Sequence, residues 1–362
     1  MTSSLLFIPD ISGFTNFVQT TEINHSQHVI AELLEKLLAA NKYSMELAEV
    51  EGDALFFYKE NQLLAKKELF DQMEAMYIAF YSHLRLLEKN RVCTCRACST
   101  AINLELKIVV HTGSFQFIEI QDRRKPFGEA VIQVHRLLKN SVNSDNYVLI
   151  SKDMVEVINM NSINESSLFN FKKGKDVYDD KTLEYIYAEV NVDDLKLKSF
   201  DEGKMMDFTK QPDLVFEKNY AINSADLTEI ITNYKYRHLW ETSADEIIYE
   251  EKEVTRKGSS HVCVVNGEQF NFKVVTKKGK GGELIYGEET SNIPIMDKFY
   301  QFFTIESISE NESKLKVQLY VQAKNIIQKL MIYFLAKKTF SKKMDKSLSM
   351  IAKVCVKYND QT

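Results

Sequence analysis

The hydrophobic pattern of this chain changes once, across a charged and polar stretch, Asp193–Gln211, that Pro212 follows. Before this stretch, short apolar runs typical of strands alternate with segments of helical spacing. After it, strand patterns follow one another with only turns between them, and one long helical pattern ends the chain. Because 362 residues are also too many for one ordinary core, we expect two domains, residues 1–191 and 213–362, with a linker over residues 192–212.

Composition narrows the class of protein. Hydrophobic residues make up 44% of the chain and charged residues 27%, which is the balance of a soluble globular protein. The formal net charge of −5 argues against a broad nucleic-acid-binding face. No apolar run reaches the roughly 18 residues of a membrane-spanning helix, and the N-terminus lacks the pattern of a secretory signal. Five cysteines cannot form a disulfide framework. We expect a cytoplasmic protein without a nucleic-acid partner.

The first domain is expected to be an α+β sheet with helices on one face. One hairpin turns at Glu51-Gly52-Asp53, and a second strand pair surrounds Thr112-Gly113. The first strand ends at Pro9, Asp10 and Gly13. Strands are expected at Leu5–Ile8, Ser44–Val50, Ala54–Tyr58, Leu104–His111, Phe115–Ile120, Tyr147–Ile150 and Glu184–Glu189, and helices at Asn24–Ala40, Leu63–Glu88 and Ala130–Lys139.

The second domain opens with a strand at Leu214–Ala221 and a short helix at Ala225–Thr232. Residues 245–322 then predict consecutive antiparallel strands, and a long helix runs from Lys324 to about Lys357. This order predicts a curved antiparallel sheet around the C-terminal helix.

Two aspartates of the first domain lie where chemistry is expected. Asp10 stands at the end of a strand, before a glycine-bearing turn into a helix, and Asp53 stands in a hairpin turn. If both strands belong to one sheet, the two carboxylates converge and can bind a pair of divalent cations. Taken singly, each aspartate equally suits a structural role, as a helix cap or a turn residue.

The sequence motifs around these aspartates resemble those of the class III nucleotide cyclases, the adenylyl and guanylyl cyclase homology domains. That family opens with F-x-D-I-x-G-F-T, matched by Phe7–Thr15, and continues with a hairpin reading G-D-A, matched within Val50–Ala54. A strand ending H-T-G is matched at His111–Gly113. The family's G-x-x-V-N-x-A-A-R-L helix is partly kept at Gly128–Leu137, and a late Lys-Gly-Lys is matched at Lys173–Lys175. The resemblance covers residues 1–190 and implies a cyclase-homology, ferredoxin-like α+β domain.

The resemblance also implies roles for single residues. Asp10 and Asp53 would hold two Mg²⁺ or Mn²⁺ ions, Arg136 would stabilise charge on the α-phosphate, and Lys173 would contact the triphosphate tail. Sites of this family form between two cyclase domains, so a single domain per chain implies a homodimer with a nucleoside triphosphate as substrate. The backbone expected to cradle the triphosphate is that of Ile11, Gly13, Phe14 and Thr15.

Two positions, Ile132 and Lys125, depart from the family pattern, and a third, Glu49, bears on the choice of base. Ile132 replaces the family's transition-state Asn and cannot donate a hydrogen bond, a loss that typically costs ~10²–10³ in rate. The position that reads the base is Glu49, as in guanylyl cyclases, and a carboxylate can accept from guanine N1–H and N2. The second base-reading position is Lys125, which matches neither standard pattern, so guanine is favoured while other bases stay open.

Three cysteines crowd into one short segment, Cys93-Thr94-Cys95-Arg96-Ala97-Cys98. Thiolates at this spacing suit a zinc ion that would join the preceding helix to the following strand, with His83, His111 or a partner's residue as the fourth ligand. Unpaired structural cysteines and a reversible disulfide are the alternatives.

The second domain resembles the START-like helix-grip superfamily, which includes polyketide cyclases and Bet v 1, in its element order rather than in a motif. The resemblance implies a hydrophobic ligand between the sheet and the long helix, although the same aromatic residues also suit a plain core. Basic residues on the C-terminal helix would allow contact with an anionic membrane, but closing the helix's own core is the favoured interpretation. The aromatic candidates are Tyr249, Phe270, Phe272, Phe302 and Tyr320.

Two classes of function follow. One is an enzyme that converts a nucleoside triphosphate to a 3′,5′-cyclic nucleotide and pyrophosphate. The other is a catalytically weak homologue whose occupancy by a nucleotide or a hydrophobic ligand regulates a partner. The paired aspartates favour the enzyme, and Ile132 favours the binding module.

Overall fold

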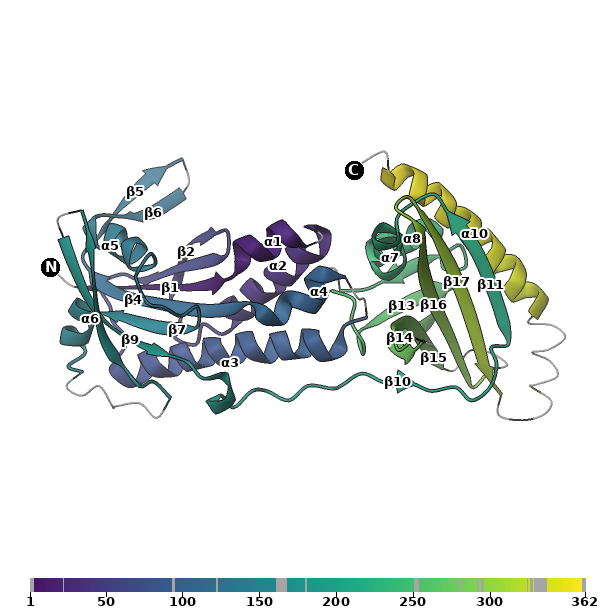
Figure 1. Cartoon of the computed structure of the whole chain (residues 1–362), viewed down its shortest axis with the longest axis horizontal. Helices are drawn as coiled ribbons and strands as arrows, with labels where there is room; N and C mark the ends of the chain where they lie inside the picture. The colour runs from purple at the N-terminus through teal and green to yellow at the C-terminus, as the bar shows by residue number, and fades with distance from the viewer. Residues whose placement is uncertain are drawn as a thin grey trace. The chain divides into compact units, whose positions relative to one another are not determined.

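A computed structural model of the chain describes residues 3–21, 23–92, 95–121, 123–160, 168–179, 181–250, 254–279, 281–291, 293, 296–323, 325, 328 and 337–359. The chain folds into two compact units (Figure 1). The N-terminal unit consists of Met1–Leu86 and Thr100–Phe200, and the C-terminal unit consists of Leu87–Ser99 and Asp201–Thr362. The segment Leu87–Ser99 belongs to the C-terminal unit because Val92 packs into that unit's core and the Asn90 carbonyl accepts from the Lys257 N–H at 2.6 Å. Nothing in its sequence pattern indicated this.

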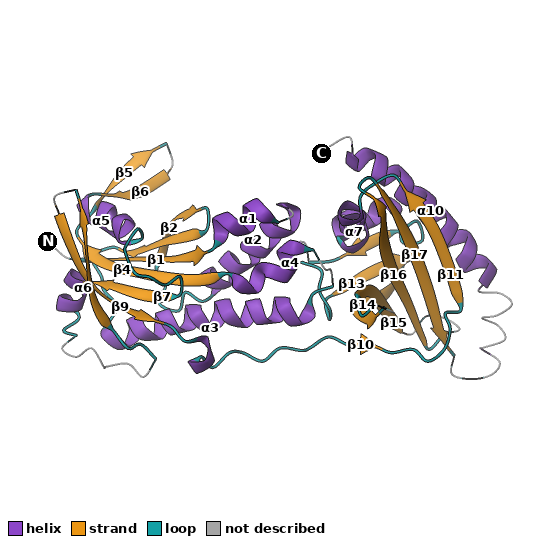
Figure 2. Ribbon diagram, viewed as in Figure 1, coloured by secondary structure: helices purple, strands orange, loops and turns teal. Residues whose placement is uncertain are grey.

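The N-terminal unit is a mixed α+β fold of strands and helices (Figure 2). Its main sheet has seven strands in the order β2-β3-β1-β4-β7-β9-β8. All neighbouring strands are antiparallel except β4 and β7, which are parallel. The strands are β1 (Ser4–Ser12), β2 (Glu46–Glu51), β3 (Ala54–Lys59), β4 (Glu105–Gly113), β7 (Tyr147–Ser151), β8 (Lys172–Tyr178) and β9 (Lys181–Glu189). Of these, β8 was not predicted.

Helices cover both faces of this sheet, which corrects the expectation of helices on one face. Leu6 and Ile8 of β1 pack with helix α5 on one side, while Leu5 and Phe7 point to the other side and are also fully buried. On that second side, the Tyr77 hydroxyl of α3 donates to the Leu106 carbonyl of β4 at 2.8 Å. The helical elements are α1 (Phe14–Thr20), α2 (Ile23–Ala39), α3 (Lys66–Asn90), α4 (Arg96–Thr100), η1 (Ala101–Asn103), α5 (Glu129–Leu137), α6 (Lys152–Val157) and η2 (Val192–Asp194).

The first strand does not end at Pro9. It continues to Ser12, with Pro9 opposite Ile108 of β4. A proline cannot donate to a ladder, and the ladder between β1 and β3 has partners at Phe7 and Asp10 but none at Pro9. Pro9 therefore lies at a position where β1 and β3 form no paired residues, so its lack of an N–H is tolerated. Because the strand continues past Pro9, Asp10 lies within the sheet.

The expected strand pair around Thr112-Gly113 is wrong. Strand β4 pairs with β1 and β7, and β5 (Gln116–Ile120) pairs instead with β6 (Arg123–Phe127) in a separate two-stranded ribbon. The ribbon contains Pro126 and charged residues, so its second strand carries no alternating apolar signal. Gly113 serves a different purpose: a Cβ there would lie 2.6 Å from the Ala130 Cβ, so glycine allows α5 to start against the end of β4.

The C-terminal unit is a meander of antiparallel strands in the order β11-β17-β16-β15-β14-β13-β12, with the two-residue strand β10 parallel to β14. Helix α10 contacts β11, α7 and α8, and it spans Lys337–Asn359, within the expected long C-terminal helix. Most of residues 324–336 lie outside the described residues. The elements are β10 (Met205–Met206), β11 (Leu214–Tyr220), α7 (Ser224–Thr232), α8 (Tyr234–Trp240), β12 (Glu246–Ile248), β13 (Ser260–Val265), β14 (Glu268–Lys278), β15 (Leu284–Ser291), β16 (Lys298–Ser309), β17 (Glu312–Gln322) and α10 (Lys337–Asn359).

The two faces of this second sheet carry separate apolar clusters. One cluster joins the sheet to α7, α8 and α10, and Tyr249 and Phe272 pack against it. Phe302 and Tyr320 belong to the cluster on the other face, where Phe208 stacks on Tyr320 at a centroid distance of 4.1 Å. The expectation that these aromatic residues line one cavity is therefore wrong, because a shift of one residue along a strand reverses the face. Among the described helices, none is both long and apolar enough to cross a bilayer.

Candidate functional site

Strand β1 and the hairpin of β2 and β3 bring Asp10 and Asp53 to neighbouring positions. Asp10 lies opposite Ala54 in the register of β1 and β3, and the Ile11 N–H donates to the Asp53 carbonyl at 3.0 Å. Gly52 makes this turn possible, since its φ of 72° is in the left-handed region. One aspartate thus lies in the ladder and the other in the adjoining turn.

The pKa values of both carboxylates are raised, chiefly by burial. Burial raises the pKa of Asp10, and the Lys107 ammonium, 3.4 Å from Asp10 Oδ2, opposes that rise. Burial raises the pKa of Asp53, and the negative charge of Asp10 raises it further. Glu51 adds a smaller repulsion at Asp10. Lys107 supplies one positive charge beside the two aspartates, so negative charge is in excess at this pair.

This donor set fits a divalent cation. Hard oxygen ligands from two carboxylates are what Mg²⁺ and Mn²⁺ prefer, and a cation would compensate the burial that raises both pKa values and the repulsion that Asp53 feels from Asp10. Sequence reasoning missed Lys107, which lies directly opposite Asp10 in β4. Its role could be read only from the register of β1 and β4, two strands that are far apart in the chain.

The turn after β1 is set up for a short helix. Gly13 has a φ of 84°, and its carbonyl accepts from the Phe17 N–H at 3.0 Å to start α1. The Ile11 N–H is used by Asp53, so Ile11 cannot donate to a phosphate as expected, whereas the first N–H groups of α1, on Phe14 and Thr15, have no intrahelical acceptor. The Ser12 hydroxyl is buried and has no hydrogen-bond partner among the described residues.

The two base-reading candidates bind each other. Lys125 Nζ on β6 lies 2.7 Å from both carboxylate oxygens of Glu49 on β2. Both side chains are well exposed, at 38% and 43%. A carboxylate and an ammonium are thus held side by side at the open edge of the hairpin.

Helix α5 presents Ile132 to solvent and Arg136 to another carboxylate. Ile132 is 53% exposed, an unusual setting for a large aliphatic side chain on a short helix. Arg136 Nη2 donates to Asp179 in the turn between β8 and β9. One helical turn therefore separates an exposed apolar residue from a paired guanidinium.

Lys173 lies far from the aspartates within one chain. It is in the edge strand β8, opposite Ile186, and four strand steps separate β8 from β1 in the sheet. At about 4.8 Å a step, the two strands are roughly 19 Å apart. One chain thus groups Asp10, Asp53, Glu49 and Lys125 near the hairpin, with Lys173 toward the opposite edge of the sheet.

A further charged pair next to the hairpin was also missed. His135 on α5 donates from Nε2 to the Glu51 carboxylate at 3.0 Å and from Nδ1 to the Val131 carbonyl at 2.8 Å. Both contacts are satisfied together when both ring nitrogens carry a proton, so this geometry favours the imidazolium form. The bond to Glu51 raises the pKa of His135 accordingly, against the lowering effect of burial.

The cysteine segment is described only in part. Cys93 lies outside the described residues, and the Cys98 N–H donates to Cys95 Sγ at 3.3 Å at the start of α4. The two histidines named as fourth ligands are engaged elsewhere: buried His83 pairs with Glu32 at 2.6 Å, and buried His111 bonds Ser151 at 2.8 Å. Both sit in the interior of the N-terminal unit, so neither is available to thiolates.

A family model and a curated protein each match part of this chain. Residues 30–147 match a family described as "Protein of unknown function (DUF2652)". The uncharacterized protein Rv2561/Rv2562 of Mycobacterium tuberculosis is 32% identical over 122 residues, which cover 34% of this chain and 57% of that protein.

Solved structures similar to about half of the chain are adenylyl and guanylyl cyclase domains. The adenylyl cyclase CyaB from P. aeruginosa has 18% identity and a TM-score of 0.39, over 52% of this chain and 94% of its own. The guanylate cyclase domain of RhGC from Catenaria anguillulae, in complex with GTP, has 14% identity and a TM-score of 0.37, over 52% of this chain and 97% of its own.

Proposed function

We propose that the N-terminal unit is a class III-type nucleotide cyclase that works as a homodimer on a nucleoside triphosphate. The observation that carries this proposal is the pair of Asp10 and Asp53, two half-buried carboxylates at neighbouring positions whose charges repel. A purely structural role gives no reason to place two such groups together, because repulsion and desolvation both cost stability. A site for divalent cations does give a reason.

The roles of the residues follow from their chemistry. Asp10 and Asp53 would hold two Mg²⁺ or Mn²⁺ ions, which supply Lewis-acid activation of the 3′-hydroxyl and charge neutralisation of the pyrophosphate. The free N–H groups at the start of α1 and the unpartnered Ser12 hydroxyl would donate to phosphate oxygens. Arg136 would leave Asp179 and donate to the α-phosphate, and Lys173 would hold the triphosphate tail.

Two copies of the chain are needed for such a site. The roughly 19 Å between β1 and β8 prevents Lys173 of one chain from reaching a phosphate held near Asp10 of the same chain. Large apolar side chains stand exposed on three neighbouring elements: Val50 on β2 is 50% exposed, Phe127 on β6 is 59% exposed and Ile132 on α5 is 53% exposed. A second copy that covers them would bring the two halves of the site together.

The pair of Glu49 and Lys125 favours guanine as the base. The Watson–Crick edge of guanine offers two N–H donors beside an oxygen acceptor. Glu49 would accept from the donors and Lys125 would donate to the oxygen, while the two groups stay beside each other as they are in the free protein.

A single assay tests the proposal. Purified protein is incubated with Mn²⁺ and each of the four ribonucleoside triphosphates, and cyclic nucleotide and pyrophosphate are quantified. We expect one cyclic product in excess, lost in Asp53→Asn and kept in Asp193→Asn, a matched control on an exposed aspartate of the same unit. Absence of any cyclic product from folded, Mn²⁺-loaded protein would defeat the enzyme proposal.

The second candidate is a nucleotide-binding regulatory module without turnover. Ile132 favours it, since this position cannot donate to a transition state, and so does Arg136, which is already paired with Asp179. On this account the same protein binds a triphosphate with Mn²⁺ and releases no pyrophosphate. Equilibrium binding measured beside the product assay separates the two candidates.

Two other predictions stay as proposals. Cys93, Cys95 and Cys98 are proposed as a zinc or redox site, and zinc analysis of purified protein beside a triple Cys→Ser variant tests it. The C-terminal unit is proposed as a START-like helix-grip domain on its combination of an antiparallel sheet and a C-terminal helix.

A further inference from the structure

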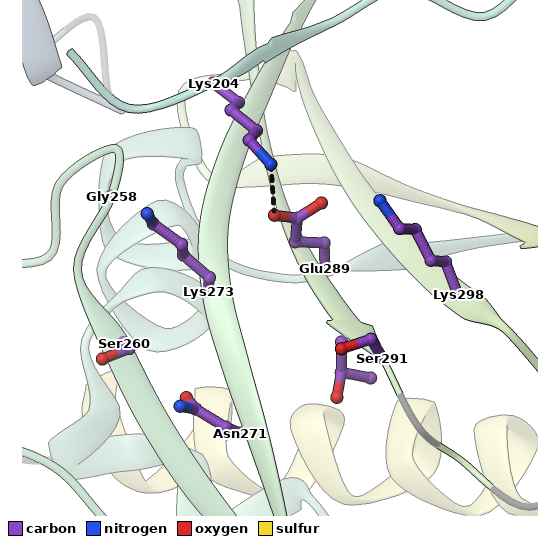
Figure 3. Close-up of a pocket in the computed structure, with 9 residues that line it drawn as sticks. Lys204, Gly258, Ser260, Asn271, Lys273, Glu289, Ser291 and Lys298 are labelled. Atoms are coloured by element: carbon purple, nitrogen blue, oxygen red, sulfur yellow. Dashed lines mark ion pairs between the residues drawn. The ribbon is translucent and has the colours of Figure 1, made fainter. Parts of the chain in front are cut away.

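The C-terminal unit has a polar groove of about 430 Å³ on one face of its sheet (Figure 3). Three lysines and one glutamate supply the charges around it, and side chains with hydroxyl or amide groups supply the remaining polar atoms. Its lining consists of Lys204, Gly258, Ser260, Asn271, Lys273, Glu289, Thr290, Ser291 and Lys298.

Strand register explains why these side chains meet. Lys273 of β14 lies opposite Ser260 of β13 on one side and Glu289 of β15 on the other, and Ser291 of β15 lies opposite Lys298 of β16. Directly paired residues point to the same face of a sheet, so four adjacent strands contribute to one polar surface. Lys204 comes from the segment just before β10, which runs alongside β14.

Positive charge exceeds negative charge in this groove. Lys204 Nζ lies 3.7 Å from Glu289 Oε1, the ion pair drawn in Figure 3. Lys273 Nζ lies 3.4 Å from Asp201 Oδ2, a carboxylate that is 80% exposed. Lys298 makes no ion pair with any described residue. The three lysines outnumber the carboxylates of Glu289 and Asp201 by one. The groove therefore has a net positive charge, although the whole chain has a net charge of −5.

We propose that this groove binds a small soluble molecule that carries a phosphate monoester. Lys298 and Lys204 would bind the phosphate as point charges, and Ser260, Asn271 and Ser291 would donate to its oxygens or to the attached alcohol. The volume suits a small phosphorylated metabolite.

Calorimetric titration of the full chain with glycerol 3-phosphate tests the proposal, with glycerol as the uncharged counterpart. We expect saturable binding of the phosphate ester alone, weakened at higher ionic strength. Lys298→Gln should weaken binding by roughly tenfold, as expected for the loss of one charge-assisted contact. Glu289→Gln should strengthen it several-fold, because the variant removes a repelling carboxylate and releases Lys204.

The matched control is Lys278→Gln, which removes the same charge from an exposed position at the end of β14, in the same sheet but outside the groove, and should leave binding unchanged. A second arm uses phosphatidylcholine vesicles with and without phosphatidic acid, the lipid source of the same headgroup. Binding to phosphatidic acid alone would overturn the soluble ligand. Absence of glycerol 3-phosphate binding, or equal weakening by Lys298→Gln and Lys278→Gln, would overturn the groove itself.

Discussion

Lys125 Nζ on β6 lies 2.7 Å from both carboxylate oxygens of Glu49 on β2. The two residues are 76 positions apart in sequence, and they join the two-stranded ribbon to the hairpin that carries Asp53. The ribbon is not part of the main sheet, so this pair helps to orient it. Under the proposed function, the same pair faces the base of the nucleotide.

Lys125→Gln should therefore change base selectivity more than stability. An ion pair this exposed contributes about 0–1 kcal/mol, so the melting temperature should move little. The ratio of guanosine to adenosine triphosphate turnover should fall by roughly 10–100-fold, because a charge-assisted bond to the guanine oxygen is lost. Arg124→Gln, which removes the neighbouring pair with Glu60, is the matched control and should keep the ratio. Equal ratios in both variants would contradict a base-reading role.

Asp53→Asn should stabilise the protein while it removes cation binding. Burial and the Asp10 charge raise the pKa of Asp53, so its folded form favours the proton more than its unfolded form does. The stability that protonated Asp53 contributes is thus fully present below the pKa of the unfolded chain and is lost as pH rises through the pKa of the folded protein. At pH 7 Asp53 is ionised, and its charge destabilises the folded state. Because solvent screens this partly exposed carboxylate, we expect a gain of about 0–1 kcal/mol at pH 7 that shrinks toward pH 3. Thermal unfolding with and without Mn²⁺ measures it, and a loss of stability would contradict the repulsion.

The contact of His135 with Glu51 should depend on pH. The pKa of His135 is raised, so its contribution to stability is full below the unfolded value of about 6.5 and is lost as pH rises through the higher folded value. The pair is about one-third exposed, so we expect a change of about 0.2–1 kcal/mol after screening. Melting temperatures from mildly acidic to mildly basic pH should show this loss in the parent chain and not in Glu51→Gln. His28→Gln, on the exposed side of α2, should behave as the parent.

Local pattern predicted much of the chain, and non-local register accounts for the errors. The hairpin around Gly52 follows from turn chemistry, and α2 from helical spacing, so both could be expected within a few residues. Lys107 could not be placed beside Asp10, because β1 and β4 pair across almost a hundred residues. The assignment of Phe302 and Tyr320 to one cavity with Phe272 failed for a related reason, since the face of a strand residue depends on an exact register.

Arg237→Met should strongly destabilise the C-terminal unit. The Arg237 guanidinium donates two bonds, of 3.1 and 2.8 Å, to Glu288, and both side chains are almost fully buried. Burial alone would raise the pKa of Glu288. The positive charge of Arg237 and the hydrogen bonds from Tyr286 and Gln301 outweigh burial and hold this pKa below its usual value. Removing the guanidinium leaves a buried carboxylate without its counter-ion, at a cost of about 3–5 kcal/mol.

Chemical denaturation measures this cost. The exposed neighbour Lys235→Met is the control and should change stability by less than about 0.5 kcal/mol. The double variant Arg237→Met with Glu288→Gln should recover part of the loss, because the unpaired charge is gone. A double variant as unstable as the sum of the two single variants would mean that packing, rather than charge, dominates at this position.

Ile132→Asn separates the two candidate functions. In the enzyme account, Ile132 faces the α-phosphate across the dimer interface, one helical turn from Arg136, and Asn restores a donor at that point. Cyclic nucleotide production should then rise by ~10-fold or more, and Arg136→Ala should abolish it. In the binding account, the exposed Ile132 lies in an apolar seam between two copies. Asn then buries an unpaired amide and weakens the dimer by roughly 1–3 kcal/mol without creating activity.

Product formation and dimer dissociation are therefore measured together on this variant. Val157→Asn, which alters a 46%-exposed aliphatic residue on α6 of the same unit, is the matched control and should change neither. A stronger enzyme with an intact dimer supports the cyclase, because only a group that meets the reacting phosphate can raise turnover in this way. A weaker and still inactive dimer would instead place Ile132 in the seam and leave the site to bind nucleotide without converting it.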